Sequence, residues 1–469
     1  MSKSKKLYIL IGVLLAVTVL TVAVSKHETR KEEIRTSGQT FLEIPNDSVT
    51  LLSWDCQGKA LSFQKENGSW KYAADENFPV NSEKIADLLA PFQHLAAAFV
   101  IENVVDYGQY GLDKPTGTLH ITAGDKAYDI QLGAFSKMDS QRYLSIGDGR
   151  VYLVKEDLLE RFSLELKDLI RNDTLPSLNE VTEIRFSGTE NYSVIREENS
   201  VNTYCADDVY FSDGRPLDTK AVKKYLGVIS SLKLTDYASY YVSEDELKAF
   251  GLLEPELTLT VAYKAENEKK EAEEQQLILH VSRNPEELAT TQKKAKEGVE
   301  IKVPGYVRIG DSQIVYRVGE DAVGALMDAS YDKLRHKEVL TAAFEDISQI
   351  DVTLEGNNYR LFTENKGGKR IWHYKDGDEL DIARLQRTLM DLRAESFTSE
   401  EPGQKEELGL TVHLDNENHP EVSIQLYRYD GEQCLAVVNG ESVSLIPRSS
   451  AISLIESIYT IVLEKSPDN

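Results

Sequence analysis

The feature that most constrains the fold of this chain is one pattern of apolar residues that occurs three times. In each copy the apolar side chains recur at spacings of three and four residues, which places them on one face of a helix. Each copy therefore predicts a helix that faces a core. The three stripes are Ile85, Leu88, Leu89, Phe92 and Leu95; Val222, Tyr225, Leu226, Ile229 and Leu232; and Ile382, Leu385, Leu389 and Leu392.

Short β-favouring runs precede each stripe in the same order. Alternating apolar residues predict a first strand, a second strand follows, and a third ends in an aromatic residue, with Gly, Asn or Asp turns between them. The predicted first strands carry Val49, Leu52 and Trp54; Val181, Ile184 and Phe186; and Ile347, Ile350 and Val352. The second strands are predicted at 61–63, 192–194 and 359–361, and the third at 70–72, 202–204 and 372–374.

Each helix also has a start signal and a turn that follows it. Asn81, Asp218 and Asp381 stand at the predicted N-caps, where a side-chain oxygen accepts from free backbone N–H groups. In the first copy, Pro91 is expected to kink or shorten the helix. Glycine at the turn permits a positive φ, and in the first two copies a proline ends any helix before the next strand. The Gly-Leu pairs are at 111–112, 251–252 and 409–410.

More strands and a short closing helix are expected in every copy. The strands are predicted at 118–122, 128–132, 143–146 and 151–154, then 306–309 and 315–318, then 434–437 and 443–446. The closing helices are predicted around 158–162, 323–327 and 452–455, and the linkers 169–175 and 334–340 resemble each other. The predicted fold class is α+β, with three repeated modules of antiparallel sheet and helices on one face. The sequence leaves open whether the modules share sheet edges or pack end to end.

The N-terminus predicts a membrane anchor. Residues 1–6 include three lysines, and residues 7–24 are an uncharged, mostly apolar run of 18 residues. At about 1.5 Å per residue this run spans roughly 27 Å, enough for a bilayer core. We expect an uncleaved signal-anchor with its N-terminus inside; a cleaved signal peptide ending near 23–25 is the alternative.

The domain boundaries follow from the repeat and the anchor. The predicted parts are a cytoplasmic tail at 1–6, the transmembrane signal-anchor at 7–24, a juxtamembrane linker at 25–43, module 1 at 44–176, module 2 at 177–342 and module 3 at 343–465. Module 2 contains a charged insertion near 264–302, which we expect to form a protruding hairpin or mobile loops.

Charge and cysteine content limit the classes of function. With 53 basic and 78 acidic residues, the chain has a net charge of −25, which should repel nucleic acid and anionic lipid headgroups. A solubilising surface explains this charge more simply than an acidic docking function. Cys56, Cys205 and Cys434 lie far apart, so they indicate buried, inert thiols rather than a disulfide framework.

Signatures of catalysis, cofactor binding or metal binding are not evident, and the sequence assigns no residue to any of these roles. None of the eight histidines stands in a known metal-binding motif. Segment 413–419 (HLDNENH) offers oxygen and imidazole ligands, but a polar turn is expected there, with His413 at the repeat position of His120. Ser230 to Lys233 matches SxxK by chance, and 147–149 (GDG) predicts a hairpin turn. The 23 tyrosines permit a carbohydrate-binding surface, although sheet packing is the simpler explanation.

Three segments carry a family resemblance. Residues 110–115 (YGLDKP), 143–148 (YLSIGD) and 151–154 (VYLV), with the N-terminal anchor, resemble the bacterial domain of unknown function 4340 family over about residues 70 to 340. The resemblance implies a single-pass or exported protein, often encoded beside ABC-type export permeases similar to gliding-motility components. It supplies no functional residue to carry over.

The expected function is that of a non-enzymatic extracytoplasmic scaffold or interaction protein at the cytoplasmic membrane. Its expected partners are the lipid bilayer, through the N-terminal helix, and an ABC-type permease or another envelope protein, but not nucleic acid. The alternatives are a binding module for cell-envelope glycan or peptide and, third, an envelope hydrolase.

Overall fold

The chain forms three helix-backed sheets. The computed structural model describes residues 17–18, 21, 38–138, 140–266, 270–294, 301–375 and 379–464. It divides into two compact units: Met1–Asp173 with Leu234–Val242 and Gln313–Val315, and Thr174–Lys233 with Ser243–Ser312 and Tyr316–Asn469. The predicted tail at 1–6 and nearly all of the predicted anchor at 7–24 lie outside the described residues, as does most of the linker at 25–43. Within the described part of the chain, no helix has the length and apolar character needed to cross a bilayer.

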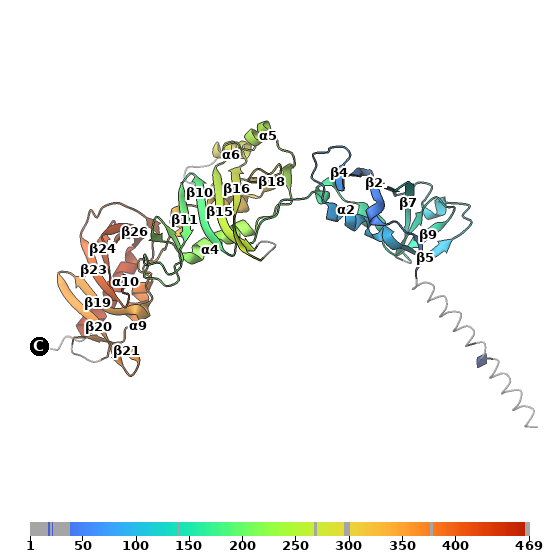
Figure 1. The fold of residues 1–469 in the computed structure, drawn as a ribbon. Helices are drawn as coiled ribbons and strands as arrows, with labels where there is room; N and C mark the ends of the chain where they lie inside the picture. The colour runs from blue at the N-terminus through green and yellow to red at the C-terminus, as the bar shows by residue number, and fades with distance from the viewer. Residues whose placement is uncertain are drawn as a thin grey trace, which may run out of the picture. The chain divides into compact units, whose positions relative to one another are not determined.

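The first module contains a nine-stranded sheet in the order β1-β5-β9-β8-β7-β6-β2-β3-β4 (Figure 1). Its strands are β1 (Gln39–Leu42), β2 (Val49–Cys56), β3 (Lys59–Glu66), β4 (Ser69–Tyr72), β5 (Leu95–Ile101), β6 (Gly117–Ala123), β7 (Lys126–Ser136), β8 (Gln141–Ser145) and β9 (Val151–Val154). Its helical segments are η1 (Asn46–Ser48), α2 (Ser82–Leu89), η2 (Ala90–His94), η3 (Gly108–Tyr110), α3 (Leu158–Phe162) and η4 (Leu166–Leu169).

The second module contains a sheet in the order β13-β12-β11-β10-β15-β16-β17-β18-β14. Its strands are β10 (Val181–Gly188), β11 (Tyr192–Arg196), β12 (Tyr210–Ser212), β13 (Arg215–Pro216), β14 (Tyr237–Ser239), β15 (Leu257–Glu266), β16 (Ala272–Arg283), β17 (Gly305–Ile309) and β18 (Val315–Val318). Its helices are α4 (Thr219–Ser230), α5 (Glu244–Ala249), α6 (Pro285–Gln292), α7 (Glu320–Met327) and α8 (Tyr331–Leu334).

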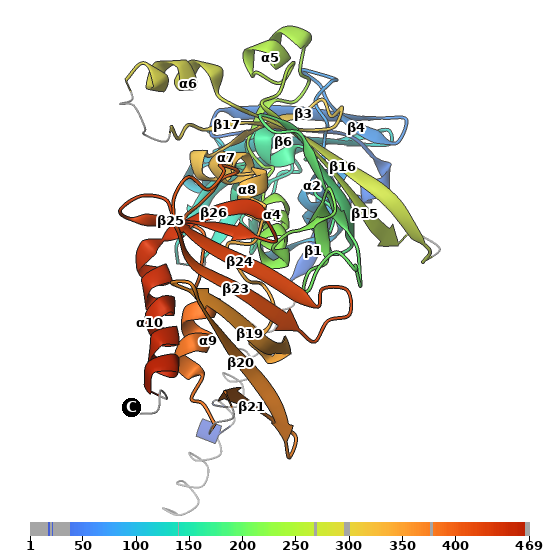
Figure 2. The ribbon, with the colours of Figure 1, turned by 90° about the vertical axis from the view of Figure 1, so that its left-hand side faces the viewer.

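The third module contains an eight-stranded sheet in the order β21-β20-β19-β23-β24-β25-β26-β22. Its strands are β19 (Ile347–Leu354), β20 (Asn357–Lys366), β21 (Lys369–Tyr374), β22 (Ser396–Phe397), β23 (Glu406–Leu414), β24 (Glu421–Arg428), β25 (Gln433–Val438) and β26 (Glu441–Pro447). The helical segments are η5 (Phe344–Asp346), α9 (Ala383–Met390) and α10 (Arg448–Glu464). Helices α9 and α10 pack side by side on one face of this sheet (Figure 2).

The three sheets have the same strand order, which confirms the predicted α+β repeat. Reading along the third sheet, its strands correspond one by one to β4-β3-β2-β6-β7-β8-β9-β5 and to β12-β11-β10-β15-β16-β17-β18-β14. Strands β1 and β13 are additions at one edge of their sheets. Among the described residues each sheet is separate, so the modules do not share edges.

One backbone irregularity also repeats. The pairing register shifts near the start of the equivalent strands β2, β10 and β19. The shifts lie between Val49 and Leu51, Val181 and Glu183, and Ile347 and Gln349. A bulge adds one residue to one strand and re-aims the side chains that follow it. Its recurrence at the same position shows that the modules share backbone geometry as well as strand order.

The apolar stripes form the buried face of the main helices. Ile85, Leu88 and Leu89 on α2 are at most 3% exposed, and Val222 and Ile229 on α4 are fully buried. Asn81 and Asp218 cap their helices as predicted, each accepting from two backbone N–H groups. In the third module Asp381 accepts from Ala383, but the helix begins one residue later, with Ile382 at the N-cap position.

The ends of the stripes differ from the prediction. Helix α2 ends at Leu89, shortened near Pro91 as expected, and the 3₁₀ segment η2 begins at Ala90, so that Leu95 is the first residue of β5 rather than a helical residue. Leu232 lies beyond α4 and is only half-buried. The periodicity extends past the helices because residues at their ends still pack into the same core. The closing helix α10, predicted to be short, has 17 residues.

The predicted third strand of module 2 was wrong. Residues 202–204 form a turn, and the third strand is β12 (Tyr210–Ser212). The turn is held by side chains rather than by a sheet ladder: Thr203 Oγ1 donates to Asp208 Oδ2 at 2.8 Å and accepts from the Cys205 N–H at 3.0 Å. Tyr204 packs instead against the apolar core of the third module.

The charged insertion contains both a hairpin and a helix. Strands β15 and β16 stay paired out to Glu266 and Ala272, so the N-terminal part of the insertion belongs to the predicted hairpin. The C-terminal part of the insertion includes helix α6, which Asn284 caps. The sequence analysis did not predict this helix. Gly111 and Gly251 have positive φ values of 67° and 71°, whereas Gly409 lies within β23, as expected from its missing proline.

Candidate functional site

Each sheet has one face directed to its helices and one face that carries polar side chains, and in the third sheet this second face also holds a small apolar cluster of Leu435, Val437 and Leu445. On β2, Leu52 and Trp54 are buried in the core while Ser53 and Asp55, between and beyond them, lie on the other face. This alternation follows from the two-residue period of a strand. The helix-free faces are therefore the surfaces on which the three modules present chemistry.

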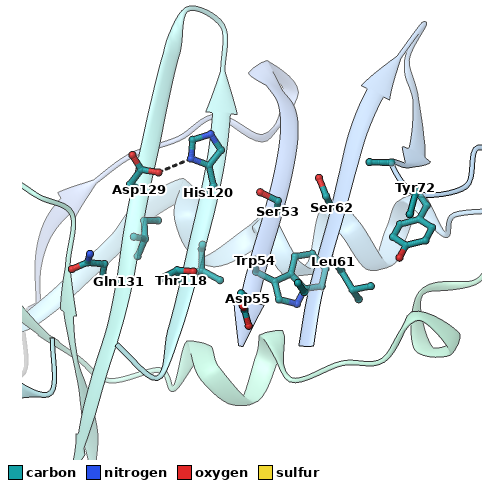
Figure 3. A pocket seen from close by; sticks show the side chains of 15 residues that line it. Ser53, Trp54, Asp55, Leu61, Ser62, Tyr72, Thr118, His120, Asp129 and Gln131 are labelled. Atoms are coloured by element: carbon teal, nitrogen blue, oxygen red, sulfur yellow. Dashed lines mark hydrogen bonds and ion pairs between the residues drawn. The ribbon is translucent and has the colours of Figure 1, made fainter. Parts of the chain in front are cut away.

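On the first sheet the polar face includes two neighbouring cross-strand rows (Figure 3). The strand register places neighbours on β3, β2, β6 and β7 directly opposite one another. One row is Ser62, Ser53, His120 and Asp129. The next row is Ala60, Asp55, Thr118 and Gln131.

These rows line a shallow hollow of about 870 Å³. Its centre carries small side chains, and His120 Nδ1 lies 2.5 Å from Asp129 Oδ1 at one side. The residues that line it include no lysine or arginine. Within the described residues, Asp55 and Asp129 form no ion pair with a lysine or arginine. The hollow thus has two carboxylates, and its one basic lining side chain is the His120 ring beside Asp129.

Ser53, His120 and Asp129 are the residue types of a hydrolase triad, but their geometry differs. Among the described contacts Ser53 makes no hydrogen bond to His120, and the Asp129 side chain is 82% exposed. In a triad the nucleophile bonds to the base, and a buried carboxylate orients it. The row is better suited to binding than to nucleophilic attack.

The same faces of modules 2 and 3 carry arginine. Arg185 occupies the position of Ser53, and its Nε lies 2.7 Å from Glu183 Oε1. In the third module Arg360 occupies the position of Ser62, and its Nε lies 2.7 Å from Asp351 Oδ1. These faces therefore neutralise their own carboxylates.

The predicted repeat equivalence of His413 and His120 was wrong by two residues. His120 pairs with Ser53, whereas its counterparts by strand register are Thr260 and Thr411. His413 pairs with Gln349 and places Nε2 3.0 Å from Asp351 Oδ2. The shift arises because the third module enters β23 directly, without the proline-terminated turn of the other two.

Segment 413–419 forms the predicted polar turn. Asn416 Oδ1 accepts from the backbone N–H groups of Asn418 and His419, and Asp415 pairs with Arg370. His419 Nε2 lies 2.9 Å from the carbonyl oxygen of Val201. Its potential ligands thus have separate partners, and the described residues contain no group of three or more His, Cys, Asp or Glu arranged to hold a metal ion.

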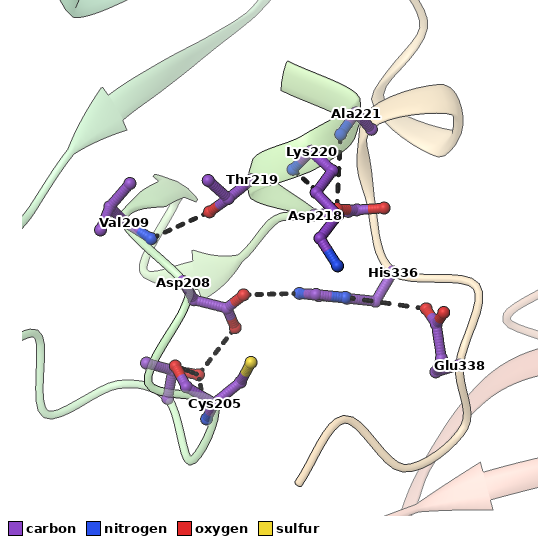
Figure 4. Close-up of polar contacts among 10 residues, drawn as sticks. Cys205, Asp208, Val209, Asp218, Thr219, Lys220, Ala221, His336 and Glu338 are labelled. Carbon is purple, nitrogen blue, oxygen red and sulfur yellow. Dashed lines mark hydrogen bonds and ion pairs between the residues drawn. The ribbon is translucent and has the colours of Figure 1, made fainter. Parts of the chain in front are cut away.

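A second polar cluster lies where module 2 connects to module 3 (Figure 4). Asp208, whose side chain is 1% exposed, accepts from Thr203 and lies 2.9 Å from His336 Nε2. His336 Nδ1 lies 3.8 Å from Glu338, which pairs with Arg393. Burial lowers the pKa of His336, but Asp208, Asp218 and Glu338 outweigh it, so the pKa is raised. The cluster holds the connecting segment against both modules.

This connection repeats an arrangement of the first module. The backbone N–H of Asp218 donates to Leu334, as that of Asn81 donates to Leu169. The resemblance predicted between the two linkers is thus confirmed by matching hydrogen bonds. The sequence did not identify His336 or Asp208, because neither stands in a motif and their separation along the chain is 128 residues.

The motifs noted in the sequence have structural roles here. Ser230 Oγ donates to the Leu226 carbonyl within α4, so its hydroxyl is engaged in the helix. Gly147 and Gly149, with φ of 78° and 86°, form the predicted turn between β8 and β9.

All three cysteines are free thiols; Cys56 and Cys434 are buried as predicted, whereas Cys205 is only half-buried. Burial raises the pKa of Cys56 and Cys205 to about 11 and that of Cys434 to about 12. These thiols stay protonated at neutral pH and are poor nucleophiles.

Fold and site together define a protein of three repeated α+β modules, each with a helix-backed sheet and an open polar face. Comparison with family profiles matches residues 70–255 and 212–412 to the family described as Domain of unknown function (DUF4340). The chain belongs to this family, as the resemblance in the sequence indicated. Comparisons with curated proteins and with solved structures find no match.

The two family matches begin at equivalent places. The first match starts in β4 and the second at the last residue of β12. These two strands occupy equivalent places in their sheets. They end shortly after Gly251 and Gly409, in the modules that follow. One family unit therefore spans a full repeat period and crosses from one module into the next.

Proposed function

We propose that this chain is a membrane-anchored, extracytoplasmic scaffold protein without enzymatic activity that holds partners of a membrane complex, with an ABC-type export system as the favoured partner. The observation that supports this function is the polar, helix-free face that each of the three sheets presents. Repetition of one module multiplies such faces within one chain. The anchor expected at 7–24 would hold them near the bilayer.

The character of these faces favours binding over catalysis. Their side chains lie on rigid strands, which fixes the spacing of hydrogen-bonding groups. The hollow on the first sheet is shallow, whereas enclosed sites that exclude water are typical of catalysis. Most residues of modules 2 and 3 belong to one compact unit, and the His336–Asp208 contact holds the segment that connects them.

Co-purification of the full-length tagged chain from mild detergent tests this function. We expect specific membrane proteins, including permease subunits, to be recovered with the chain and identified by mass spectrometry. An unrelated single-pass protein, tagged and expressed at the same level, is the control. Recovery of the isolated chain alone, in several detergents, would contradict the proposal.

A second candidate function is binding of cell-envelope glycan or peptide. The hollow on the first sheet supports it, because Ser53, Ser62, Thr118 and Gln131 offer closely spaced hydrogen-bonding groups. Sedimentation of the chain with purified cell-wall material tests this candidate. Retention on the wall material is expected if it holds, and its absence at low salt would rule it out.

The third candidate, an envelope hydrolase, is tested by a serine-reactive fluorophosphonate probe. The scaffold function predicts no labelling of the chain, since Ser53 lacks a hydrogen-bonded base. Labelling that disappears in Ser53→Ala would instead support hydrolysis.

A further inference from the structure

We propose that the hollow on the first sheet binds an extended segment of a partner protein that carries arginine. This inference rests on the proposed function as an interaction protein and names the chemistry of one of its surfaces. The modules themselves provide the comparison, because the same fold occurs three times with different side chains at equivalent places.

In module 2 the face supplies its own guanidinium group. Arg185 stands at the centre of its row, between Ser193 on β11 and Thr260 on β15. Its Nε and terminal nitrogen contact both carboxylate oxygens of Glu183, at 2.7 and 2.8 Å. The Glu183 carboxylate therefore has a bidentate partner on its own strand.

In module 3 the guanidinium comes from the neighbouring strand. Arg360 on β20 contacts Asp351 on β19 through Nε at 2.7 Å and a terminal nitrogen at 3.4 Å. His413 and Gln349 complete the surroundings of the Asp351 carboxylate, at 3.0 and 2.9 Å. The Asp351 carboxylate therefore also has a cationic partner within its own module.

In module 1 both arginine positions are serine. Ser53 corresponds to Arg185, and Ser62 corresponds to Arg360. Two short side chains leave the hollow of about 870 Å³ open. Asp55 remains at its side without a basic partner among the described residues, and Asp129, whose side chain is 82% exposed, has the His120 ring as its basic partner. A guanidinium group from a ligand would give this face the kind of cation that the faces of the other two modules carry in their own chains.

The dimensions of the hollow suit an extended peptide. Neighbouring strands lie about 4.8 Å apart, so the rows from β3 to β7 span roughly 14 Å. An extended chain advances about 3.4 Å per residue, so four residues cover this distance. Arginine is favoured over lysine because its planar guanidinium matches a carboxylate with two parallel hydrogen bonds. The net charge of −25 further favours a basic partner.

Isothermal titration of the full-length chain in detergent tests this inference. The probe is a hexapeptide of alternating arginine and serine, with alternating glutamate and serine as its acidic counterpart. We expect the basic probe alone to bind, with an affinity that falls as salt rises. The double substitution Asp55→Asn and Asp129→Asn, which keeps side-chain shape, should weaken binding about tenfold, the effect of two partly exposed ion pairs.

The decisive variant is Ser53→Arg, which gives module 1 the side chain that module 2 has at this position. It should fill the hollow and abolish binding of the basic probe. Ser423→Arg on the open face of module 3 is the matched control and should bind as the wild type does. Failure of the wild type to bind, or binding that survives Ser53→Arg, would overturn the inference. If partners still co-purify in that case, the scaffold function stands without it.

Discussion

Nε2 of His336 lies 2.9 Å from Oδ1 of Asp208, and this contact joins the segment between modules 2 and 3 to a buried carboxylate of module 2. The carboxylate also accepts from Thr203, in the turn whose neighbour Tyr204 packs on the core of module 3. The Asp208 carboxylate thus links the connecting segment to the turn of module 2 that reaches module 3.

The joint is expected to loosen as pH rises. The pKa of His336 is raised in the fold, because Asp208, Asp218 and Glu338 together outweigh the opposing effect of burial. Its contribution to stability is therefore complete below the unfolded pKa of about 6.5 and is lost as pH rises through the folded value. Hydrogen exchange, corrected for intrinsic rates, should show protection around Asp208 that falls as pH rises above about 6.5.

Two substitutions separate charge from hydrogen bonding at this joint. In His336→Gln a donor remains near Asp208 without titrating, so the pH dependence should disappear. His336→Ala leaves the carboxylate short of a partner and should cost about 1–3 kcal/mol of unfolding free energy. A pH dependence that persists unchanged in His336→Gln would show that another group controls the joint.

The first module depends on a buried ion pair between Arg142 and Asp157. Arg142 donates to both carboxylate oxygens, at 2.5 and 2.9 Å, and to the Gly133 carbonyl at 2.6 Å. Arg142→Ala would leave the largely buried Asp157 carboxylate, which also caps α3, without its cation. This change should lower the free energy of unfolding by about 3–5 kcal/mol. Arg150→Ala, which removes an exposed pair with Glu102, should have a much smaller effect on the free energy of unfolding.

Tryptophan fluorescence during urea unfolding measures this difference. Trp54 and Trp70 lie in the first module, so Trp372→Phe leaves a signal from that module alone. Burial works against ionisation of Asp157, but Arg142 lowers its pKa overall, so this contribution should be lost as pH falls below about 4. Equal effects of the two arginine substitutions would contradict the assigned role of Arg142.

The turn at Gly111 should be less tolerant of substitution than that at Gly124. Both glycines have positive φ, 67° and 57°, but an added Cβ at Gly111 would lie 2.9 Å from the Ala134 backbone nitrogen and meets nothing at Gly124. Gly124→Ala should therefore cost about 1 kcal/mol from backbone strain, and Gly111→Ala clearly more. Thermal unfolding compares them, and equal melting temperatures would show that the close approach to Ala134 does not matter.

The repeat was readable from the sequence because it rests on local periodicity. The stripes of α2 and α4 and the alternation in β2, β10 and β19 fix helix and strand types within each copy. The errors fall where long-range contacts decide. Residues 202–204 have strand-like composition, but the buried Asp208 captures Thr203 and the turn packs on module 3.

The candidate site was beyond the reach of motif analysis. Ser53 and Ser62 are unremarkable in sequence, and the hollow follows only from aligning strand registers across the three sheets. The predicted equivalence of His413 and His120 failed for the same reason. Only the pairing of β19 with β23 shows that Thr411, two residues before His413, is the counterpart of His120. His120 and Asp129, by contrast, are close in the chain and meet across a hairpin.

Site-specific photo-crosslinking in intact cells tests the central claim most directly. A photoreactive amino acid is placed at Ser53 in one strain and at Arg185, its counterpart in module 2, in another. The account predicts a crosslink from position 53 to a distinct partner protein, through a segment that contains arginine, and none to that partner from position 185. Identical products from both positions, or no crosslinked partner at position 53, would contradict it.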